Sequence, residues 1–363
     1  MVDLTTTLCG LVLRNPILPA AGPPGRNAEA LLACARGGAG GLVSKTISTR
    51  AAEVPAPNMV ELPGGFLNCE LWSELPPKRW IEAEYARARE AGIPLIIGLG
   101  YSADDIRTLA PQIRPFADAV ELSTHYIGED PGPMQKAIGA ARELLDVPVI
   151  VKLSPLGRDM VLAAQAAVAA GAQAIAAINS FGPCLAIDIE SGRPLLGSPH
   201  GYGWLSGPAI KPLALRCVYE IAQAVAVPIV GVGGIANGRD AIEMLMAGAS
   251  AVQVCTAAIL QGPHVYGKIA GELANWLEAH GYRSPGQIVG LAARQATLPQ
   301  RPLYATVDPE ACTGCQLCQR SCVYHAIRME ARKAYIDPTV CAACGLCVTR
   351  CRPGAIRLLW EPM

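Results

Sequence analysis

The sequence predicts an α/β protein in which a (β/α)8 TIM barrel is followed by a small, cysteine-rich α+β domain. Three observations support this prediction. Eight short apolar runs alternate with amphipathic helical stretches before about residue 300. The 363 residues are 51% hydrophobic, which is enough to fill a sizeable core. Two similar cysteine runs lie near the C-terminus.

Each predicted strand is apolar on both faces, as parallel strands covered by helices are. The strands are predicted at 17–21, 41–46, 95–99, 117–123, 149–153, 174–179, 229–232 and 251–255. The helices are predicted at 27–37, 79–91, 103–114, 134–146, 158–170, 211–226, 238–247 and 265–281. Eight such units in roughly 250 residues match a (β/α)8 barrel. A doubly wound open sheet is the alternative architecture.

Two long connections, 47–77 and 180–210, interrupt the alternation. Both follow strands, so in a barrel both lie over the carboxyl end, where active sites are built. We therefore expect them to form lids over a substrate.

A proline-containing stretch at 298–311 separates the barrel, residues 1–300, from the second domain, residues 301–363. Within the second domain, 308–330 and 337–359 form an internal repeat.

The repeat carries Cys-x-x-Cys-x-x-Cys-x-x-x-Cys twice, a spacing typical of proteins that hold two [4Fe–4S] clusters. In the two-cluster arrangement the fourth cysteine of each run binds the other cluster. The first set of ligands is then Cys312, Cys315, Cys318 and Cys351, and the second is Cys341, Cys344, Cys347 and Cys322. Zinc ribbons or disulfides are the alternatives, but they leave the third cysteine of each run without a purpose. We therefore expect a ferredoxin-like 2×[4Fe-4S] domain that transfers single electrons.

Composition and charge restrict the class further. Thirty basic residues balance thirty acidic ones, so no nucleic-acid partner is expected. The six remaining cysteines stand singly among small or apolar residues, as reduced thiols do in a cytoplasmic protein. We expect neither a signal segment nor a membrane span, and hence a cytoplasmic location.

Two lysines and a glycine-rich turn indicate a flavin. Gly231-Val-Gly-Gly234 follows the seventh strand and Thr256 follows the eighth, where barrels commonly bind phosphate. Lys45 and Lys152 lie at the ends of the second and fifth strands. A buried ammonium needs an anionic or acceptor partner, which a flavin provides, although a structural ion pair is the alternative. A flavin also exchanges hydride with a substrate and single electrons with iron–sulfur clusters.

With these features in place, the chain resembles the dihydropyrimidine dehydrogenase and dihydroorotate dehydrogenase family, here joined to a C-terminal two-cluster ferredoxin module. The segments that carry the resemblance are 15–22, 44–48, 65–71, 151–155, 178–180, 205–215, 233–235 and 253–257. The resemblance implies FMN contacts from Ala20, Ala21, Lys45, Thr46, Lys152, Gly207, Gly233, Gly234, Cys255 and Thr256. It also implies a substrate pocket that uses Asn68, Asn179 and Ser180, although each of these could instead cap a loop or helix.

The fourth strand departs from the family pattern. Where the family has Asn-Leu-Ser-Cys-Pro, this chain has Glu121-Leu-Ser-Thr124-His125. We expect Glu121 to bind substrate or activate His125. Thr124 stands at the place of the family's proton-exchanging cysteine, whereas His125 titrates nearer neutrality. His125 packed in a loop without a catalytic role is the alternative.

The expected function is a flavin-dependent oxidoreductase that adds or removes two hydrogens across a C–C bond of a small cyclic substrate. Nothing else in the chain matches a dinucleotide-binding turn, so a ferredoxin or an NAD(P)H-oxidising flavoprotein subunit is the expected electron partner. The resemblance implies a homodimer. The alternatives are dihydropyrimidine dehydrogenase proper, acting on uracil or dihydrouracil, and a noncatalytic electron-transfer subunit.

Overall fold

The computed structural model describes residues 2–123, 130–155, 160–295 and 302–360. The chain divides into two compact units, Met1–Arg294 and Gln295–Met363. The predicted boundary at 300/301 falls at 296–301, outside the described residues.

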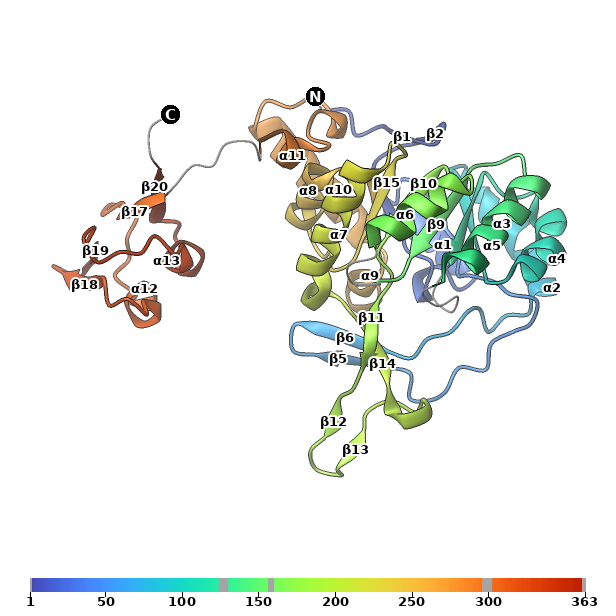
Figure 1. Cartoon of the computed structure of the whole chain (residues 1–363), viewed down its shortest axis with the longest axis horizontal. Coiled ribbons are helices and arrows are strands. Elements are labelled where there is room, and N and C mark those ends of the chain that lie inside the picture. Colours follow the sequence, from blue (N-terminus) through green and yellow to red (C-terminus); the bar gives the residue numbers. More distant parts are fainter. Residues whose placement is uncertain (1, 124–129, 156–159, 296–301, 361–363) are drawn as a thin grey trace. The chain divides into compact units, whose positions relative to one another are not determined.

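The first unit is built on eight parallel strands in the order β3-β16-β15-β10-β9-β8-β7-β4. Their bounds are β3 Ile17–Pro19, β4 Leu42–Val43, β7 Leu95–Leu99, β8 Ala119–Ser123, β9 Val149–Leu153, β10 Ala174–Ala177, β15 Ile229–Val232 and β16 Ala249–Val254. The end strands β3 and β4 contact each other, so the sheet closes almost completely (Figure 1). This confirms the TIM barrel and rules out the open doubly wound sheet.

The helices that follow the strands form the outer layer (Figure 1). They are α1 Ala28–Arg36, a continuous helical segment from α2 Pro77–Arg79 through η2 Trp80–Glu84 and α3 Tyr85–Ala88 to η3 Arg89–Ala91, α4 Ala103–Ile113, α5 Pro131–Leu144, α6 Met160–Ala169, α7 Lys211–Ala224, α8 Gly238–Ala247 and α10 Val265–Ala279. The described residues also form short helices: η1 Pro23–Gly25, η5 Pro199–Gly201, η6 Pro208–Ile210, α9 Thr256–Gln261, η7 Pro285–Gln287 and α11 Leu291–Gln295.

Side-chain caps fix where several helices begin. Asn27 accepts a hydrogen bond from the Ala30 amide at the start of α1, and Asn237 caps α8 in the same way. Ser102 and Asp105 form a reciprocal capping box on α4.

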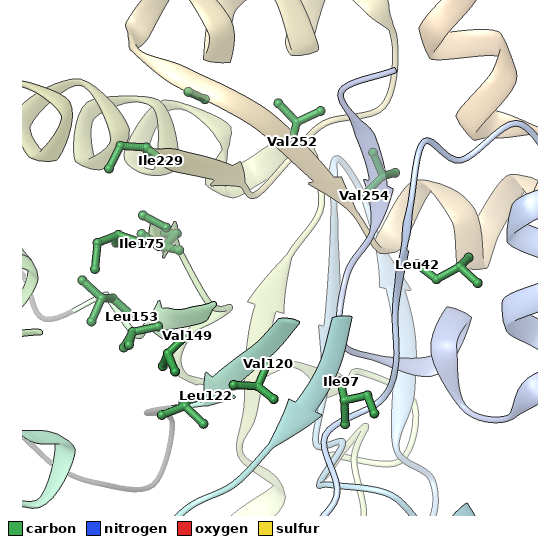
Figure 2. Close-up of a cluster of buried hydrophobic side chains, with 14 of the residues drawn as sticks. Leu42, Ile97, Val120, Leu122, Val149, Leu153, Ile175, Ile229, Val252 and Val254 are labelled. Atoms are coloured by element: carbon green, nitrogen blue, oxygen red, sulfur yellow. The ribbon is translucent and has the colours of Figure 1, made fainter. Parts of the chain in front are cut away.

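The strands alternate between two buried layers, as their period of two requires. On β8, Val120 and Leu122 face the helices in the outer layer, whereas Ala119 belongs to the inner layer. Figure 2 shows outer-layer side chains around the barrel, among them Ile175 and Ile229. The N-terminal hairpin of β1 Thr6–Leu8 and β2 Leu11–Leu13 packs against the inner layer.

The two long connections form a four-stranded antiparallel sheet in the order β11-β14-β6-β5. Its strands are β5 Met59–Leu62, β6 Gly65–Asn68, β11 Phe181–Cys184 and β14 Gly203–Ser206. A small hairpin, β12 Ile187–Asp188 and β13 Arg193–Pro194, extends from it (Figure 1). Because both connections leave the carboxyl ends of barrel strands, we call this structure the lid sheet.

The second unit is a small α+β fold. Its strands are β17 Pro302–Val307, β18 Ile327–Glu330, β19 Lys333–Ile336 and β20 Ile356–Trp360, and its helices are α12 Leu317–Ser321 and α13 Leu346–Arg350. The strands pair as the antiparallel ribbons β17–β20 and β18–β19, and the two helices contact each other.

Within the described part of the chain, no helix combines the length and apolarity that a membrane crossing requires.

Candidate active site and cysteine-lined cavities

A cavity of about 220 Å³ opens at the carboxyl end of the barrel strands, next to the lid sheet. It brings together thirteen of the fourteen residues predicted to bind cofactor or substrate. These are Ala20, Ala21, Lys45, Thr46, Asn68, Lys152, Asn179, Ser180, Gly207, Gly233, Gly234, Cys255 and Thr256. Glu121 is the one that does not line it.

Glycines and hydroxyls gather on one wall of this cavity. Gly207, Gly233 and Gly234 have φ angles of +76°, +125° and +74°, which side chains other than glycine rarely adopt. Beside them, the Ser206 and Thr256 hydroxyl oxygens lie 2.9 Å apart. A Cβ at Gly207 would lie 3.2 Å from the Thr256 methyl group. Backbone without side chains, next to hydroxyl donors, fits the phosphate of a flavin nucleotide.

Lys45 connects the barrel to the first long connection. It follows β4, is 2% exposed, and donates to Glu70 Oε2 and Glu74 Oε2 at 2.6 Å each. Glu70 also accepts a hydrogen bond from Asn58 and lines the cavity. The ammonium is therefore ion-paired, and it faces the cavity together with a carboxylate.

Lys152 belongs to a polar triad inside the barrel. Its Nζ donates to Gln253 Oε1 at 3.0 Å and lies 3.6 Å from Glu121 Oε1. Gln253 Nε2 in turn donates to Glu121 Oε2. Lys152 and Gln253 line the cavity, whereas Glu121 is 1% exposed and lies away from it.

The structure therefore places Glu121 differently from our expectation. Its carboxylate accepts from Gln253 and pairs with Lys152, and it does not line the cavity, so its expected role toward substrate or His125 stays a prediction. Because side chains alternate along a strand, the next residue of β8 on the same face is Ser123, and Ser123 does line the cavity. Thr124 and His125 lie outside the described residues.

Asn68 ends β6 in the first long connection, and Asn179 follows β10 just before the second long connection begins; both line the cavity. Asn68 Nδ2 donates to the Trp204 carbonyl at 3.0 Å, and its Oδ1 accepts from the Glu70 amide at 3.2 Å. Asn179 Oδ1 accepts from the Ser180 amide at 2.9 Å. These local bonds hold the two amides in place on the cavity wall, beside the Ser180 hydroxyl.

The cavity also contains a neutral thiol. Burial raises the pKa of Cys255 to about 11, with the charge of Lys152 acting in the opposite direction. The thiol therefore stays protonated at neutral pH.

The second unit contains two smaller cavities, each lined by four cysteines. Cys312, Cys315, Cys318 and Cys351 line the first. Cys341, Cys344, Cys347 and Cys322 line the second. These are the two sets that the crossed spacing rule predicts. Amides also reach the sulfurs: Ala355 N donates to Cys351 Sγ at 3.2 Å, and Ala305 N donates to Cys341 Sγ at 3.5 Å. Four thiols around each apolar cavity, with such donors, fit iron–sulfur clusters.

Sequence reasoning missed several residues that shape the barrel cavity. Gln253 was visible as a polar residue in an otherwise apolar strand, and Glu70 as an acid in an apolar segment. Ser123 lies within the segment that departs from the family pattern. Tyr101 and Trp204 also line the cavity, and no signal in the sequence indicated them.

The comparisons with known proteins agree with this geometry. The family described as Dihydroorotate dehydrogenase matches residues 3–277, and the family described as 4Fe-4S dicluster domain matches residues 304–352. The protein called "Dihydroorotate dehydrogenase B (NAD(+)), catalytic subunit" of Methanothermobacter thermautotrophicus is 38% identical over 301 residues, covering 80% of this chain and 98% of the relative. Its namesake from Pyrococcus abyssi is 36% identical over 304 residues, covering 80% and 99%.

Fold, cavities and comparisons together define a flavin-dependent oxidoreductase that acts on a CH–CH bond, with FMN and 4Fe–4S clusters as cofactors. The chain belongs to the dihydroorotate dehydrogenase family.

Proposed function

We propose that this protein removes or adds two hydrogens across a ring C–C bond of dihydroorotate, orotate or a closely similar cyclic amide. The electrons pass singly through two [4Fe–4S] clusters to or from a protein partner. The named activity of relatives at 35–38% identity supports the substrate class. The proposal depends on one observation. The amides of Asn68 and Asn179 and the hydroxyl of Ser180 line the same cavity as Lys152 and the glycines Gly207, Gly233 and Gly234.

The polar groups match a cyclic amide acid. The side-chain amides of Asn68 and Asn179 each contain hydrogen-bond donors and an acceptor, so they complement the N–H and C=O groups of the substrate ring. The amide N–H groups and the Ser180 hydroxyl can also donate hydrogen bonds to a substrate carboxylate. Their fixed position matters because an oriented substrate needs less ordering before reaction.

The chain's own residues would hold FMN as follows. Gly207, Gly233, Gly234 and Thr256 would hold the phosphate, and Lys45 and Lys152 would bind the ring system. All six residues line the cavity. When bound, FMN supplies hydride exchange with an organic substrate and single-electron exchange with iron–sulfur clusters. The triad around Lys152 keeps that lysine oriented.

We assign proton exchange with the substrate to the segment after β8, where Thr124 and His125 follow Ser123. His125 has the better matched pKa range for a general acid, and Thr124 stands at the position of the family's cysteine. His125→Ala and Thr124→Ala should therefore differ in turnover. Equal, wild-type turnover in both would contradict the assignment.

The cluster module determines the electron path. The alignments with the relatives cover 98–99% of their length but 80% of this chain, which extends through the dicluster domain to Met363. We therefore infer that the module carries electrons between FMN and the partner, a ferredoxin or an NAD(P)H-oxidising flavoprotein subunit. A two-cluster module in the same chain as the flavin domain is also a feature of the resemblance to dihydropyrimidine dehydrogenase. It therefore favours uracil and dihydrouracil as a second candidate substrate pair.

An anaerobic titration tests the substrate. Dihydroorotate should bleach the flavin absorbance of the purified protein, and Asn179→Ala should weaken the substrate's apparent affinity by about 10- to 100-fold, because a buried hydrogen-bond partner is lost. Asn275→Ala, an exposed residue on α10, is the matched control and should behave as wild type. Bleaching by dihydrouracil but not dihydroorotate would assign the second candidate, and no bleaching by either would refute the proposal.

A further inference from the structure

The two halves of the cysteine repeat differ in the residues that flank the fourth cysteine. Arg350 and Arg352 flank Cys351, which lines the first cavity. At the equivalent places in the other half, Ser321 and Val323 flank Cys322, which lines the second cavity. The residues directly beside the fourth cysteine therefore carry positive charge in the half that lines the first cavity, whereas in the other half the nearest cation, Arg320, precedes Ser321.

Two further cations lie beside the first cavity. Lys333 Nζ donates to the backbone carbonyl of Cys312 at 2.7 Å. The Arg332 carbonyl lies against Gly314, which lines the cavity. Arg350 itself lines the cavity, and Arg352 stands between two lining residues, Cys351 and Pro353. We call Arg332, Lys333, Arg350 and Arg352 the cationic collar.

The collar is exposed and lacks internal neutralisation. All four side chains belong to exposed residues. Within residues 302–360 of the described structure, the ion pairs are those of Arg328 with Glu330 and Asp337, and none involves the collar. Glu330 is the cross-strand partner of Lys333 but is ion-paired with Arg328. Exposed cations that form no ion pair among the described residues give a positive local potential, which attracts an anionic surface.

The second cavity has a different environment. No charged residue lines it. Around it, Val323, Tyr324 and Leu346 are large apolar residues with exposed fractions of 71%, 47% and 41%. The module therefore presents one charged and one apolar cysteine cavity, although its two halves share the same cysteine spacing.

We propose that the cationic collar is the docking site of a redox protein with a carboxylate-rich surface, and that electrons enter or leave the chain through the cluster held by Cys312, Cys315, Cys318 and Cys351. This inference rests on the electron relay of the proposed function and specifies its partner. Each encounter transfers one electron between that cluster and the partner's redox centre, so one is oxidised while the other is reduced. No bond forms or breaks and no proton moves.

Binding of an acidic flavodoxin to the full-length holoprotein, measured by calorimetry, tests the docking site. Attraction between opposite charges is screened by salt, so the affinity should fall at least tenfold between about 20 and 200 mM ionic strength. The double variant Arg350→Gln/Arg352→Gln should lose about tenfold in affinity at low salt and keep wild-type affinity at high salt.

The control variant must remove the same number of positive charges from a surface outside the cationic collar. Lys136→Gln/Lys268→Gln removes two exposed cations from barrel helices and should change the affinity less than twofold. Iron and sulfide contents show whether the collar variant retains its clusters. If the double variant loses its clusters, the affinity of Lys333→Gln and the salt dependence of wild-type affinity test the same docking site.

Two results overturn the proposal: salt-independent affinity of the wild-type protein, or a collar variant with intact clusters that binds like the wild type. The substrate titration is a separate measurement. Flavin bleaching by dihydroorotate without collar-dependent binding refutes the docking site alone, and the reverse result refutes the proposed substrate alone.

Discussion

At the scale of single residues, the polar triad inside the barrel shows what the sequence can and cannot reveal. Apolar neighbours predicted that Lys152 is buried and needs an acceptor, and the structure gives it Gln253 and Glu121. Those partners are 101 and 31 positions away along the chain, on different strands. No local pattern encodes such pairings, so the sequence indicated the need for partners without identifying them.

The same limit explains the unexpected place of Glu121. Reading β8 against a family motif assigned this carboxylate to the substrate or to the activation of His125. Glu121 and Ser123 lie on the same face of the strand, but Ser123 is nearer its carboxyl end and lines the cavity. Burial of Glu121 in the inner layer is consistent with a role in neutralising Lys152.

Glu121→Gln tests this role. The substitution keeps the hydrogen-bonding shape and removes the negative charge, leaving a buried ammonium without its carboxylate. We expect a loss of about 3 kcal/mol in the free energy of unfolding, because breaking a buried pair from one side is costly. A lower midpoint of thermal unfolding of the barrel would report it.

Asp146→Asn is the control for that experiment. Its ion pair with Arg114 joins side chains that are 79% and 58% exposed, so the expected loss is below about 1 kcal/mol. Equal midpoints for Glu121→Gln and wild type would show that Glu121 does not neutralise a charged Lys152.

At the scale of elements, hydrophobic periodicity predicted the barrel well. The strands at 95–99, 149–153 and 229–232 and the helix at 238–247 have the predicted bounds, because buried parallel strands and amphipathic helices have local signatures. The lid sheet was predicted only as two long connections. Its central pairing joins Leu67 to Leu205, and pairings between such distant segments leave no periodic signal in either one.

The ion pairs of Lys45 hold the first long connection against the barrel. Removal of the Lys45 charge should therefore make local opening of the lid sheet easier. Lys45→Gln removes the charge that holds Glu70 and Glu74. Amides of segment 65–77 should then exchange with deuterium about tenfold faster, since local opening needs less free energy. Hydrogen-exchange mass spectrometry measures this directly.

Lys78→Gln provides the comparison, because its ion pair with Glu82 joins side chains that are 79% and 62% exposed. It should leave exchange in segment 65–77 at the wild-type rate. Unchanged exchange in Lys45→Gln would mean that backbone bonds such as Ser73 N to Thr46 O at 2.8 Å hold the connection without the lysine.

At the scale of the whole molecule, the two units have cores of very different size. The barrel has an outer and an inner buried layer with dozens of side chains. Among residues 302–360, the second unit has a hydrophobic cluster of seven buried residues, and two of them are the cysteines Cys318 and Cys347. Units of this size commonly need disulfides or metals for stability.

Removal of iron should therefore unfold the second unit and leave the barrel intact. Metal-binding free energy is also folding free energy where the ligands form much of the core, as Cys318 and Cys347 do here. After oxidative chelation of the full-length protein, limited proteolysis with mass spectrometry should yield a resistant fragment that ends near Arg294, and segment 302–360 should be digested. Protein kept anaerobic with the chelator alone should retain its iron and resist cleavage in both units. A second unit that stays resistant after complete loss of iron would show that its apolar residues suffice to fold it, and that the cysteines serve electron transfer without supporting the structure.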